Sequence, residues 1–289
     1  MHVREDEPRA GPSSEVQIVA VDGGSAAVRF DRVATEEPLE IRLRAGNDSR
    51  SVAVTMRTPG NDFELSAGFL YCEGVMAHQR DLRRISYCVD VDVAQRYNTV
   101  SVELMRGELP PLEALERHFT VTSACGVCGK ASMDALRARG LEPIASQLRV
   151  EPATIVALPD RLRAAQGIFE KTGGLHAAAL FDSAGELLAV REDVGRHNAL
   201  DKLIGWAIFH KRLPLDGAIV MVSGRASYEL VQKALSAGVP FLCAVSAPSS
   251  LAINLAREFG LTLIGFLRGA RFNVYANGWR VSGSEGRPA

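Results

Sequence analysis

The first third of the chain alternates apolar and polar residues with the two-residue period of β-strands. Within residues 16–33 this alternation predicts two strands on either side of the turn Asp22-Gly23-Gly24. Residues 39–43 and 52–56 alternate in the same way around Gly46-Asn47-Asp48, which predicts an antiparallel hairpin. We expect a helix that Asn61 or Asp62 caps and that ends near Gly74, followed by strands over residues 84–93 and 98–106.

After residue 118 the pattern changes to short apolar runs that alternate with amphipathic helical stretches. Such an alternation is typical of an α/β sheet covered by helices on both faces, where ligands gather at the carboxyl ends of the strands. We expect helices near residues 130–139, 152–167, 197–210, 226–237 and 249–258, and strands over residues 177–181, 187–191, 217–222, 239–245 and 261–267.

These patterns predict two domains between short tails. A mainly antiparallel β domain with one helix occupies residues 15–118, and an α/β domain occupies residues 119–280. Residues 1–14 are charged and contain proline and glycine, so we expect a disordered tail there and a second tail over residues 281–289.

Composition narrows the functional class. The 289 residues are 47% hydrophobic with a net charge of −1, so no overall field favours a nucleic acid or a membrane surface. The N-terminus lacks the apolar region of a signal peptide, and no apolar run reaches about 18 residues. Five cysteines are few and odd in number, which fits a reducing compartment. We therefore expect a cytoplasmic protein.

The most distinctive motif is a pair of thiols, Cys125 and Cys128, each followed by a glycine. The pair precedes a predicted helix, and both the helix dipole and Lys130 favour the thiolate form. The alternative is half of a zinc site, but zinc needs about four ligands and no second pair of this kind exists. The other three cysteines are scattered in apolar surroundings, where buried, inert thiols are expected: Cys72, Cys88 and Cys243.

Candidate anion-binding residues follow three of the predicted strands. Ser223 and Ser246 lie between a strand and the next helix, where they are either simple helix caps or part of a phosphate site. Arg268 and Arg271 flank a glycine at the end of the last predicted strand, and they form either a phosphate fork or a solvated strand end. Neither a Walker motif nor a GxGxxG motif after a strand is present.

Residues 191–198 form the densest polar cluster in the sequence. His197 follows Asp193 by four residues, so the two side chains can pair at a helix start. The cluster is either a wall of a functional site or a set of caps and ion pairs that ties a helix to the preceding hairpin. His176 is a further candidate, with a buried structural histidine as the alternative.

Several of these motifs, in this order, resemble the FdhD family of formate dehydrogenase accessory sulfurtransferases. The resemblance extends over about residues 30–276. It is carried by Thr58–Asp62, Glu73-Gly74, the segment from Cys125 to Gly129, Thr172–His176, Arg191–Asn198, Ser223–Arg225, Ser246–Ser249 and Phe266–Arg271.

The resemblance implies a fold and an activity. The expected fold class is α/β, α+β overall, with a three-layer domain similar to cytidine deaminase and a smaller, mainly antiparallel β domain. The implied activity is transfer of sulfur from a cysteine desulfurase to the bis-molybdopterin guanine dinucleotide form of the molybdenum cofactor, for use by formate dehydrogenase. Cys125 would carry the persulfide, with Cys128 as its neighbour in transfer.

The resemblance also implies a cofactor site. Because the cofactor contains guanine dinucleotide, we expect guanosine diphosphate to bind as a fragment ligand. Two clustered thiols are too few for zinc, so we expect no protein-bound zinc. We further expect a homodimer. The site residues implied by the resemblance are Phe266, Leu267, Arg268, Gly269, Ala270 and Arg271. From the loop and cluster positions described above we add Ser223, Ser246 and His197 as cofactor-binding candidates.

Three other functions remain as alternatives. The CxxC motif also occurs in thiol-disulfide oxidoreductases, although their sites follow the first strand of a compact βαβ unit. A zinc nucleobase deaminase would need a proline at the position of Ala124 and a glutamate two residues after a histidine, which His176 lacks. A chaperone that binds the cofactor without transferring sulfur is the third alternative.

Overall fold

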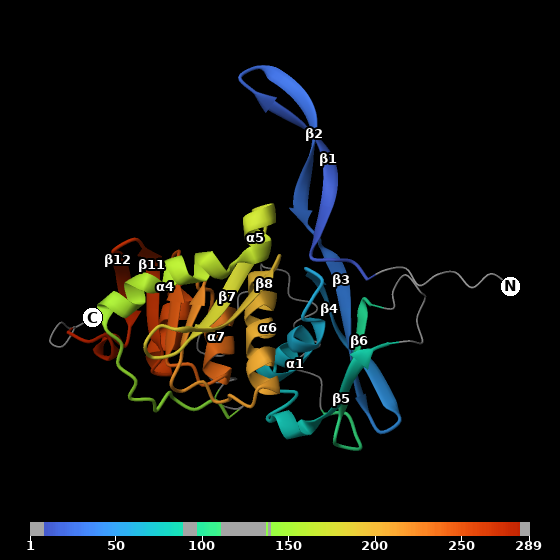
Figure 1. Cartoon of the computed structure of the whole chain (residues 1–289). Coiled ribbons are helices and arrows are strands. Elements are labelled where there is room, and N and C mark those ends of the chain that lie inside the picture. The colour runs from blue at the N-terminus through green and yellow to red at the C-terminus, as the bar shows by residue number, and fades with distance from the viewer. Residues whose placement is uncertain (1–8, 89–96, 111–136, 138–139, 284–289) are drawn as a thin grey trace.

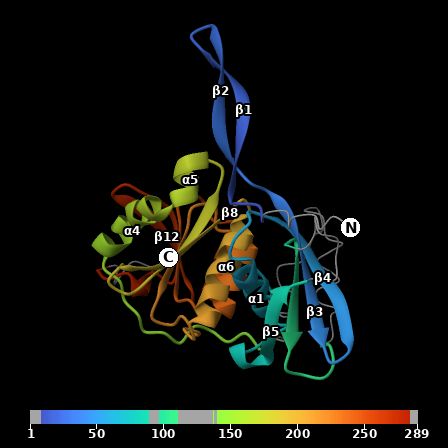
Figure 2. The ribbon, with the colours of Figure 1, turned by 45° about the vertical axis from the view of Figure 1, so that its right-hand side comes forward.

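The computed structural model describes residues 9–88, 97–110, 137 and 140–283. Its first element is an antiparallel hairpin of β1 (Ser13–Asp22) and β2 (Ser25–Ala34), which rises clear of the body in both views (Figures 1 and 2). The turn has positive φ angles at Gly23 and Gly24, which glycine adopts without steric cost. The expectation of disorder over residues 1–14 is therefore wrong for residues 9–14, because β1 begins at Ser13 and Arg9 pairs with Asp62.

A four-stranded sheet follows, in the order β4-β3-β6-β5. The predicted hairpin is confirmed, and β6 pairs in parallel with its first strand. The strand predicted over residues 84–93 lies further toward the N-terminus, and residues 89–93 of it are outside the described residues. The elements are β3 (Glu37–Ala45), β4 (Asp48–Arg57), the short 3₁₀ turn η1 (Gln79–Asp81), β5 (Leu82–Tyr87) and β6 (Thr99–Leu104).

The helix α1 (Asp62–Cys72) joins this sheet to the rest of the molecule. It packs against α6 (Arg196–Phe209), and glycines allow the two backbones to touch. A Cβ atom at Gly68 would clash with the carbonyl of Asp201, and one at Gly205 would clash with the carbonyl of Glu64. Side chains of β3, α1 and α6 belong to one apolar cluster, so the two sheets share a core.

The larger sheet has six strands in the order β12-β11-β10-β9-β7-β8. Its centre, β9, β10 and β11, is parallel, whereas β7 and β12 run antiparallel to their neighbours. The final strand, β12, was not predicted from the sequence. The strands are β7 (His176–Phe181), β8 (Leu187–Asp193), β9 (Ile219–Val222), β10 (Phe241–Ala244), β11 (Thr262–Arg268) and β12 (Arg271–Ala276).

Helices cover both faces of this sheet. Alternate strand residues such as Val220 and Leu242 belong to the core formed with α6, α7 (Tyr228–Ser236) and α8 (Ser250–Glu258). The intervening residues, such as Ile219, pack with α4 (Pro152–Ala165) on the opposite face. The expected three-layer α/β fold beside a smaller β sheet is therefore confirmed (Figure 1).

Two shorter elements complete the described part of the chain. The helix α5 (Gly167–Thr172) follows α4 closely, and the 3₁₀ turn η3 (Gly278–Arg280) follows β12. Among the described helices, none is long and apolar enough to cross a membrane. Of the helix predicted over residues 130–139, only Arg137 is described, and it is helical. The proposed boundary at residue 118 lies outside the described residues.

Candidate functional site

One edge of the six-stranded sheet gathers most of the described candidate residues. The parallel strands β9, β10 and β11 end there, and the antiparallel β7 begins there with His176. Ser223 and Ser246 follow the first two of these strands, and the loop of Arg268 to Arg271 follows the third. Because open α/β sheets bind ligands beyond the carboxyl ends of their strands, this edge is the candidate site.

A cavity of about 510 Å³ opens beside this edge. Its walls come from α4, α5 and the Gly173–Leu175 loop, and His176, Ser223 and Val245 line its sheet side. A volume of this size is typical of small-molecule pockets, which lie in the range of about 300–1,000 Å³. The cavity can therefore hold a nucleotide-sized part of a ligand.

The structure corrects the expected position of Ser223. The helix after it begins only at Tyr228, so Ser223 is not at a helix start. Its hydroxyl instead accepts a hydrogen bond from the Ala177 amide at 2.9 Å, and its own amide donates to the Ala177 carbonyl at 2.9 Å. Ser223 therefore fixes the loop after β9 to the start of β7, at the mouth of the cavity.

Ser246 is likewise not a helix cap. The cap of α8 is Ser249, whose hydroxyl accepts from the Ala252 amide at 3.2 Å. The carbonyl of Ser246 accepts from the Phe266 amide at 3.2 Å, which ties the loop after β10 to the end of β11. Both serines lie at the expected edge, but they hold loops together rather than presenting a helix N-terminus.

The two predicted arginines face one another across the β11–β12 turn. Arg268 and Arg271 are paired in the strand register, and both are exposed. The Nε of Arg268 donates to the Val245 carbonyl at 3.0 Å, so its guanidinium is held near the loop after β10. Like charges directly opposite one another repel, and no described carboxylate forms an ion pair with either arginine. An anion bound between them would relieve that repulsion.

The rest of this turn divides into buried and exposed residues. Leu267 is fully buried in the core, so its side chain does not face a ligand. Phe266 is exposed and adopts a positive φ of 52°, beside a register irregularity between Gly265 and Arg268. Gly269 also has a positive φ, and with Ala270 it forms the exposed tip of the turn. This irregular backbone places Phe266 and Arg268 on the outside, with their ring and guanidinium 5.9 Å apart.

His197 lies away from the cavity. Its Nε2 is 3.2 Å from the hydroxyl of Ser227 and 3.8 Å from a carboxylate oxygen of Glu229. It lines a different cavity, of about 300 Å³, between β4, α1, α6 and α7. The expected pairing of His197 with Asp193 is wrong.

The neighbouring Arg196 is a residue that the sequence analysis did not single out. Its Nε is buried and has no hydrogen-bond acceptor within the described part of the chain. Its positive charge, after burial, is a cause of the lowered pKa values of both His176 and His197. Gly224 lies between Arg196 and the ring of His176. The signal in the sequence was the arginine that precedes His197, but only the fold shows that it reaches toward His176.

We expect the His197 ring to stay neutral down to a pH well below the ordinary pKa of histidine. Burial, aided by the charge of Arg196, lowers its pKa to about 4, against about 6.5 in an unfolded chain. Between these two values the unfolded chain binds a proton that the folded chain does not, so stability should fall as the pH falls from about 6.5 to about 4. NMR titration of the ring, assigned with His197→Gln, should give a midpoint near 4. A midpoint near 6.5 would contradict this account.

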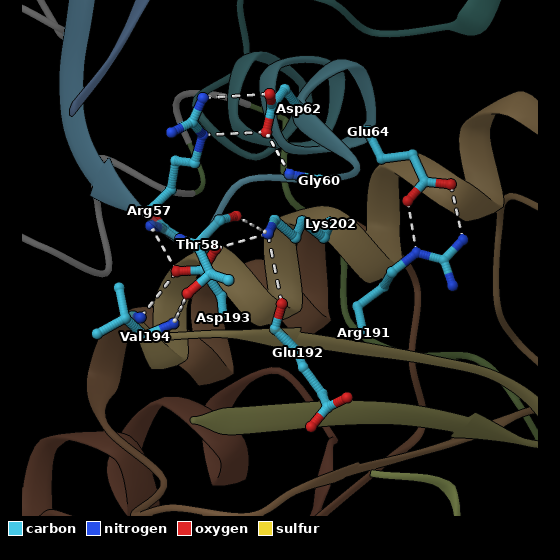
Figure 3. A network of polar contacts seen from close by, with 12 residues as sticks. Arg57, Thr58, Gly60, Asp62, Glu64, Arg191, Glu192, Asp193, Val194 and Lys202 are labelled. Carbon is cyan, nitrogen blue, oxygen red and sulfur yellow. Dashed lines mark hydrogen bonds and ion pairs between the residues drawn. The ribbon is translucent and has the colours of Figure 1, made fainter. Parts of the chain in front are cut away.

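The polar cluster over residues 191–198 serves mainly to join the two sheets (Figure 3). Arg191 makes a two-point ion pair with Glu64 of α1, at 2.5 and 2.7 Å. The Glu192 carboxylate accepts hydrogen bonds from the backbone amides of Ile168 and Phe169 at the start of α5. Asp193 is fully buried and pairs with Lys202 at 2.6 Å. This arrangement supports the interpretation of the cluster as caps and ion pairs.

The segment from Arg57 to Asp62 supplies the other half of this joint. Arg57 and Asp62 form a buried ion pair, with Nε and Oδ1 3.1 Å apart. Thr58 donates its amide to Asp193 at 3.1 Å, and its carbonyl accepts from Lys202 at 2.9 Å. The segment from Arg57 to Asp62 therefore fixes the end of β4 to the end of β8 and to the first turns of α6 through hydrogen bonds and ion pairs.

Two of the three described cysteines are poorly placed for thiolate chemistry. Cys72 and Cys243 are fully buried, and burial raises the pKa of each thiol, that of Cys243 to about 12. Cys88 is only half-buried, which corrects the expectation for it, and its sulfur lies 3.9 Å from a guanidinium nitrogen of Arg42. Cys125 and Cys128 lie outside the described residues.

Comparison with known proteins points in one direction. The sequence model of the FdhD/NarQ family matches residues 34–282. The sulfur carrier protein FdhD of Streptomyces coelicolor is 54% identical, and the match covers 92% of this chain and 94% of that protein. The protein of the same name from Mycobacterium tuberculosis is 52% identical, and the match covers 88% of this chain and 93% of that protein.

A solved structure gives the same indication. The crystal structure of a protein assigned as a formate dehydrogenase accessory protein, from Desulfotalea psychrophila, matches with a TM-score of 0.72. The two sequences are 26% identical, and the match covers 95% of this chain and all of that one.

Proposed function

The chain belongs to the FdhD/NarQ family, and from this premise we propose that it is a sulfur carrier that serves formate dehydrogenase. In this proposal Cys125 accepts sulfur as a persulfide from a cysteine desulfurase. The sulfur then passes to the bis-molybdopterin guanine dinucleotide cofactor, which is the substrate of the transfer.

The observation that carries the proposal is the state of the other thiols. A persulfide carrier needs an accessible thiolate, because the thiolate is the nucleophile. Cys72 and Cys243 are excluded by complete burial and raised pKa values. Of the cysteines that remain, only Cys125 and Cys128 are spaced for a two-thiol reaction and precede a lysine and a predicted helix.

The chemistry balances with these two thiols. The thiolate of Cys125 attacks the outer sulfur of the desulfurase persulfide, and the desulfurase thiolate leaves, so this step involves no net oxidation. Attack of the Cys128 thiolate on the inner sulfur of the Cys125 persulfide then releases hydrosulfide and leaves a disulfide. The two thiols supply the two electrons that reduce the transferred sulfur, and a cellular thiol reductant must restore them.

The edge of the six-stranded sheet suits the cofactor as substrate. The pyrophosphates of the cofactor are anions that a pair of guanidinium groups binds well. Arg268 and Arg271 at this edge are exposed and have no described carboxylate partner. The adjoining cavity of about 510 Å³ gives room for a nucleotide-sized part. Ser223 and Ser246 contribute by fixing the loops around it.

The direct test is the mass of the protein after incubation with a cysteine desulfurase and cysteine. We expect a gain of one sulfur, about 32 Da, that a thiol reductant removes, because persulfides are reversible modifications. The modified peptide should contain Cys125. A protein that binds the cofactor but never gains sulfur would be a chaperone instead. Loss of two hydrogen atoms without sulfur gain, reversed by reductant, would show a disulfide and would indicate a thiol-disulfide oxidoreductase.

Guanosine diphosphate should bind as a fragment of the substrate, and Arg271→Ala should weaken that binding about tenfold or more. A charge-assisted hydrogen bond contributes roughly 1.5–3 kcal/mol, and about 1.4 kcal/mol corresponds to a factor of ten. Arg271→Lys should restore only part of the affinity, because it keeps the charge and loses the planar fork. Calorimetric titration measures these differences.

The matched control for this titration is Arg84→Ala, which removes an exposed arginine from the other sheet. Its affinity should equal that of the unchanged protein, and sulfur gain on Cys125 should persist in Arg271→Ala. Unchanged nucleotide affinity in Arg271→Ala would place the cofactor site elsewhere.

A further inference from the structure

The cavity that His197 lines is a second candidate binding site, between the two sheets. Its volume is about 300 Å³, and it shares no lining residue with the cavity at the edge of the six-stranded sheet. Its walls come largely from β4 and from three helices that contact one another, α1, α6 and α7 (Figure 1). This volume is at the lower end of the range of about 300–1,000 Å³ for small-molecule sites. The cavity can therefore hold a small organic molecule.

One part of the cavity lining is apolar. Ile41, Val52 and Leu65 line it and are buried in the core that the two sheets share, and the half-buried Phe69 lines it as well. Moving apolar surface of a ligand from water onto such side chains is favourable. This part of the cavity suits a hydrocarbon or aromatic group.

The α7 helix supplies a polar part of the lining. Glu229, Gln232 and Lys233 are spaced i, i+3 and i+4, which places them on one face of the helix, and all three line the cavity. Gln232 is only 7% exposed, and its side-chain amide makes no hydrogen bond to any residue that the structure describes. Buried amides normally have partners, so this one has a donor and an acceptor available for a ligand.

The ionisable groups that line the cavity have a negative balance. The carboxylate of Asp201 holds the ammonium of Lys233 at 2.8 and 2.9 Å, so these two charges neutralise one another. Lys233 is therefore not available as an anion site. The remaining carboxylates in the lining are those of Glu73 and Glu229.

Glu229 is the more accessible of these carboxylates, with a side chain that is 56% exposed. Among the described residues its one ion-pairing candidate is His197, whose Nε2 lies 3.8 Å away. Burial, aided by the charge of Arg196, lowers the pKa of His197 to about 4, so the ring is neutral and leaves the Glu229 charge unpaired. Even with Arg196 counted, the balance stays negative, and the cavity attracts cations and repels anions.

We propose that this cavity binds a small organic cation, a primary amine with a hydrocarbon or aromatic body. The ammonium group donates hydrogen bonds to the Glu229 carboxylate and to the side-chain carbonyl of Gln232. The body of the ligand packs against Leu65 and Phe69. This site is separate from the thiols and from the edge of the six-stranded sheet, and it does not rest on the function proposed above.

Calorimetric titration of the full-length protein with three probes of similar shape tests the role of charge. Phenethylamine is a cation at neutral pH, phenethyl alcohol is neutral and phenylacetate is an anion. We expect the amine to bind about tenfold or more tightly than the alcohol, because its hydrogen bonds are charge-assisted, and phenylacetate to bind most weakly. The amine should also raise the unfolding temperature, since a ligand of the folded state stabilises it.

Two variants locate the bound amine. Glu229→Gln removes the unpaired charge and should weaken phenethylamine binding about tenfold, with little effect on phenethyl alcohol. Gln232→Leu keeps the approximate size of the side chain and removes its amide, so it should weaken the binding of both probes several-fold. The matched controls Glu15→Gln and Gln17→Leu make the same changes on the exposed β1 strand and should leave every affinity unchanged.

Three results would overturn the proposal. Absence of phenethylamine binding at millimolar concentration would show that the cavity holds only water. Equal affinity for phenethylamine and phenylacetate would show that charge does not select the ligand, and full affinity in both Glu229→Gln and Gln232→Leu would place the amine elsewhere.

Folding and sulfur transfer are followed separately in the same variants. Circular dichroism should match that of the unchanged protein, and if Gln232→Leu does not fold, the exposed Glu229→Gln decides the result. The gain of sulfur on Cys125 should be equal in all four variants, so failure of the amine site remains distinct from failure of the sulfur carrier function.

Discussion

Replacing Cys125 by alanine is expected to abolish the gain of sulfur from a cysteine desulfurase, to the background of the measurement. The sulfur bond forms at a thiolate, and an alanine at this position removes the group that would carry the bond. Cys72 and Cys243 cannot substitute, because their thiols are fully buried and their pKa values are raised. Intact-protein mass spectrometry before and after reductant measures the gain.

Two further variants make this result specific. Cys88→Ala removes the half-buried described thiol, near Arg42, and should leave the gain of sulfur unchanged. Cys128→Ala should keep the persulfide on Cys125 but should slow the release of hydrosulfide, because no neighbouring thiol attacks it. Equal sulfur gain in Cys125→Ala would show that another residue is the carrier.

The layers of the fold were predictable from the sequence because local patterns determine them. Alternation over residues 39–43 and 52–56 marked β3 and β4, and the short apolar runs after residue 176 marked β7 to β11. The final strand β12 was missed because exposed polar residues interrupt its apolar positions, as an edge strand allows. Disorder was predicted wrongly for residues 9–14, since β1 begins at Ser13 and Arg9 pairs with Asp62, which is distant in the sequence.

The candidate site was predictable in its residue types and less so in its geometry. The pairing of Arg268 with Arg271 was visible as two arginines around a glycine. The roles of Ser223 and Ser246 were not, because a serine before a helix resembles a cap and only the fold shows that Ser227 and Ser249 occupy the helix starts. The position of Arg196 beside His176 depends on two strands and a helix meeting at one edge, which no local pattern encodes.

The joint between the two sheets should depend on the buried pair of Asp193 and Lys202. Asp193→Ala is expected to lower the free energy of unfolding by about 3–5 kcal/mol, because it leaves the Lys202 ammonium buried without its carboxylate. The change also removes the acceptor of the Thr58 and Gly195 amides. Urea unfolding followed by tryptophan fluorescence measures this loss of stability. Because the two sheets share one apolar cluster, we expect unfolding to remain a single transition.

The exposed ion pair of Arg83 and Glu103 provides the matched control, since its partners are 3.1 Å apart and Arg83 is 64% exposed. Arg83→Ala should cost at most about 1 kcal/mol, as exposed pairs are solvated before and after the change. Lys202→Met should lower the free energy of unfolding by about as much as Asp193→Ala does. The variant with both Asp193→Asn and Lys202→Met should lose less free energy of unfolding than the two single variants lose together, because no buried charge then remains unpaired. A loss below about 1 kcal/mol in Asp193→Ala would show that this pair does not hold the joint, and that the contact of α1 with α6 suffices.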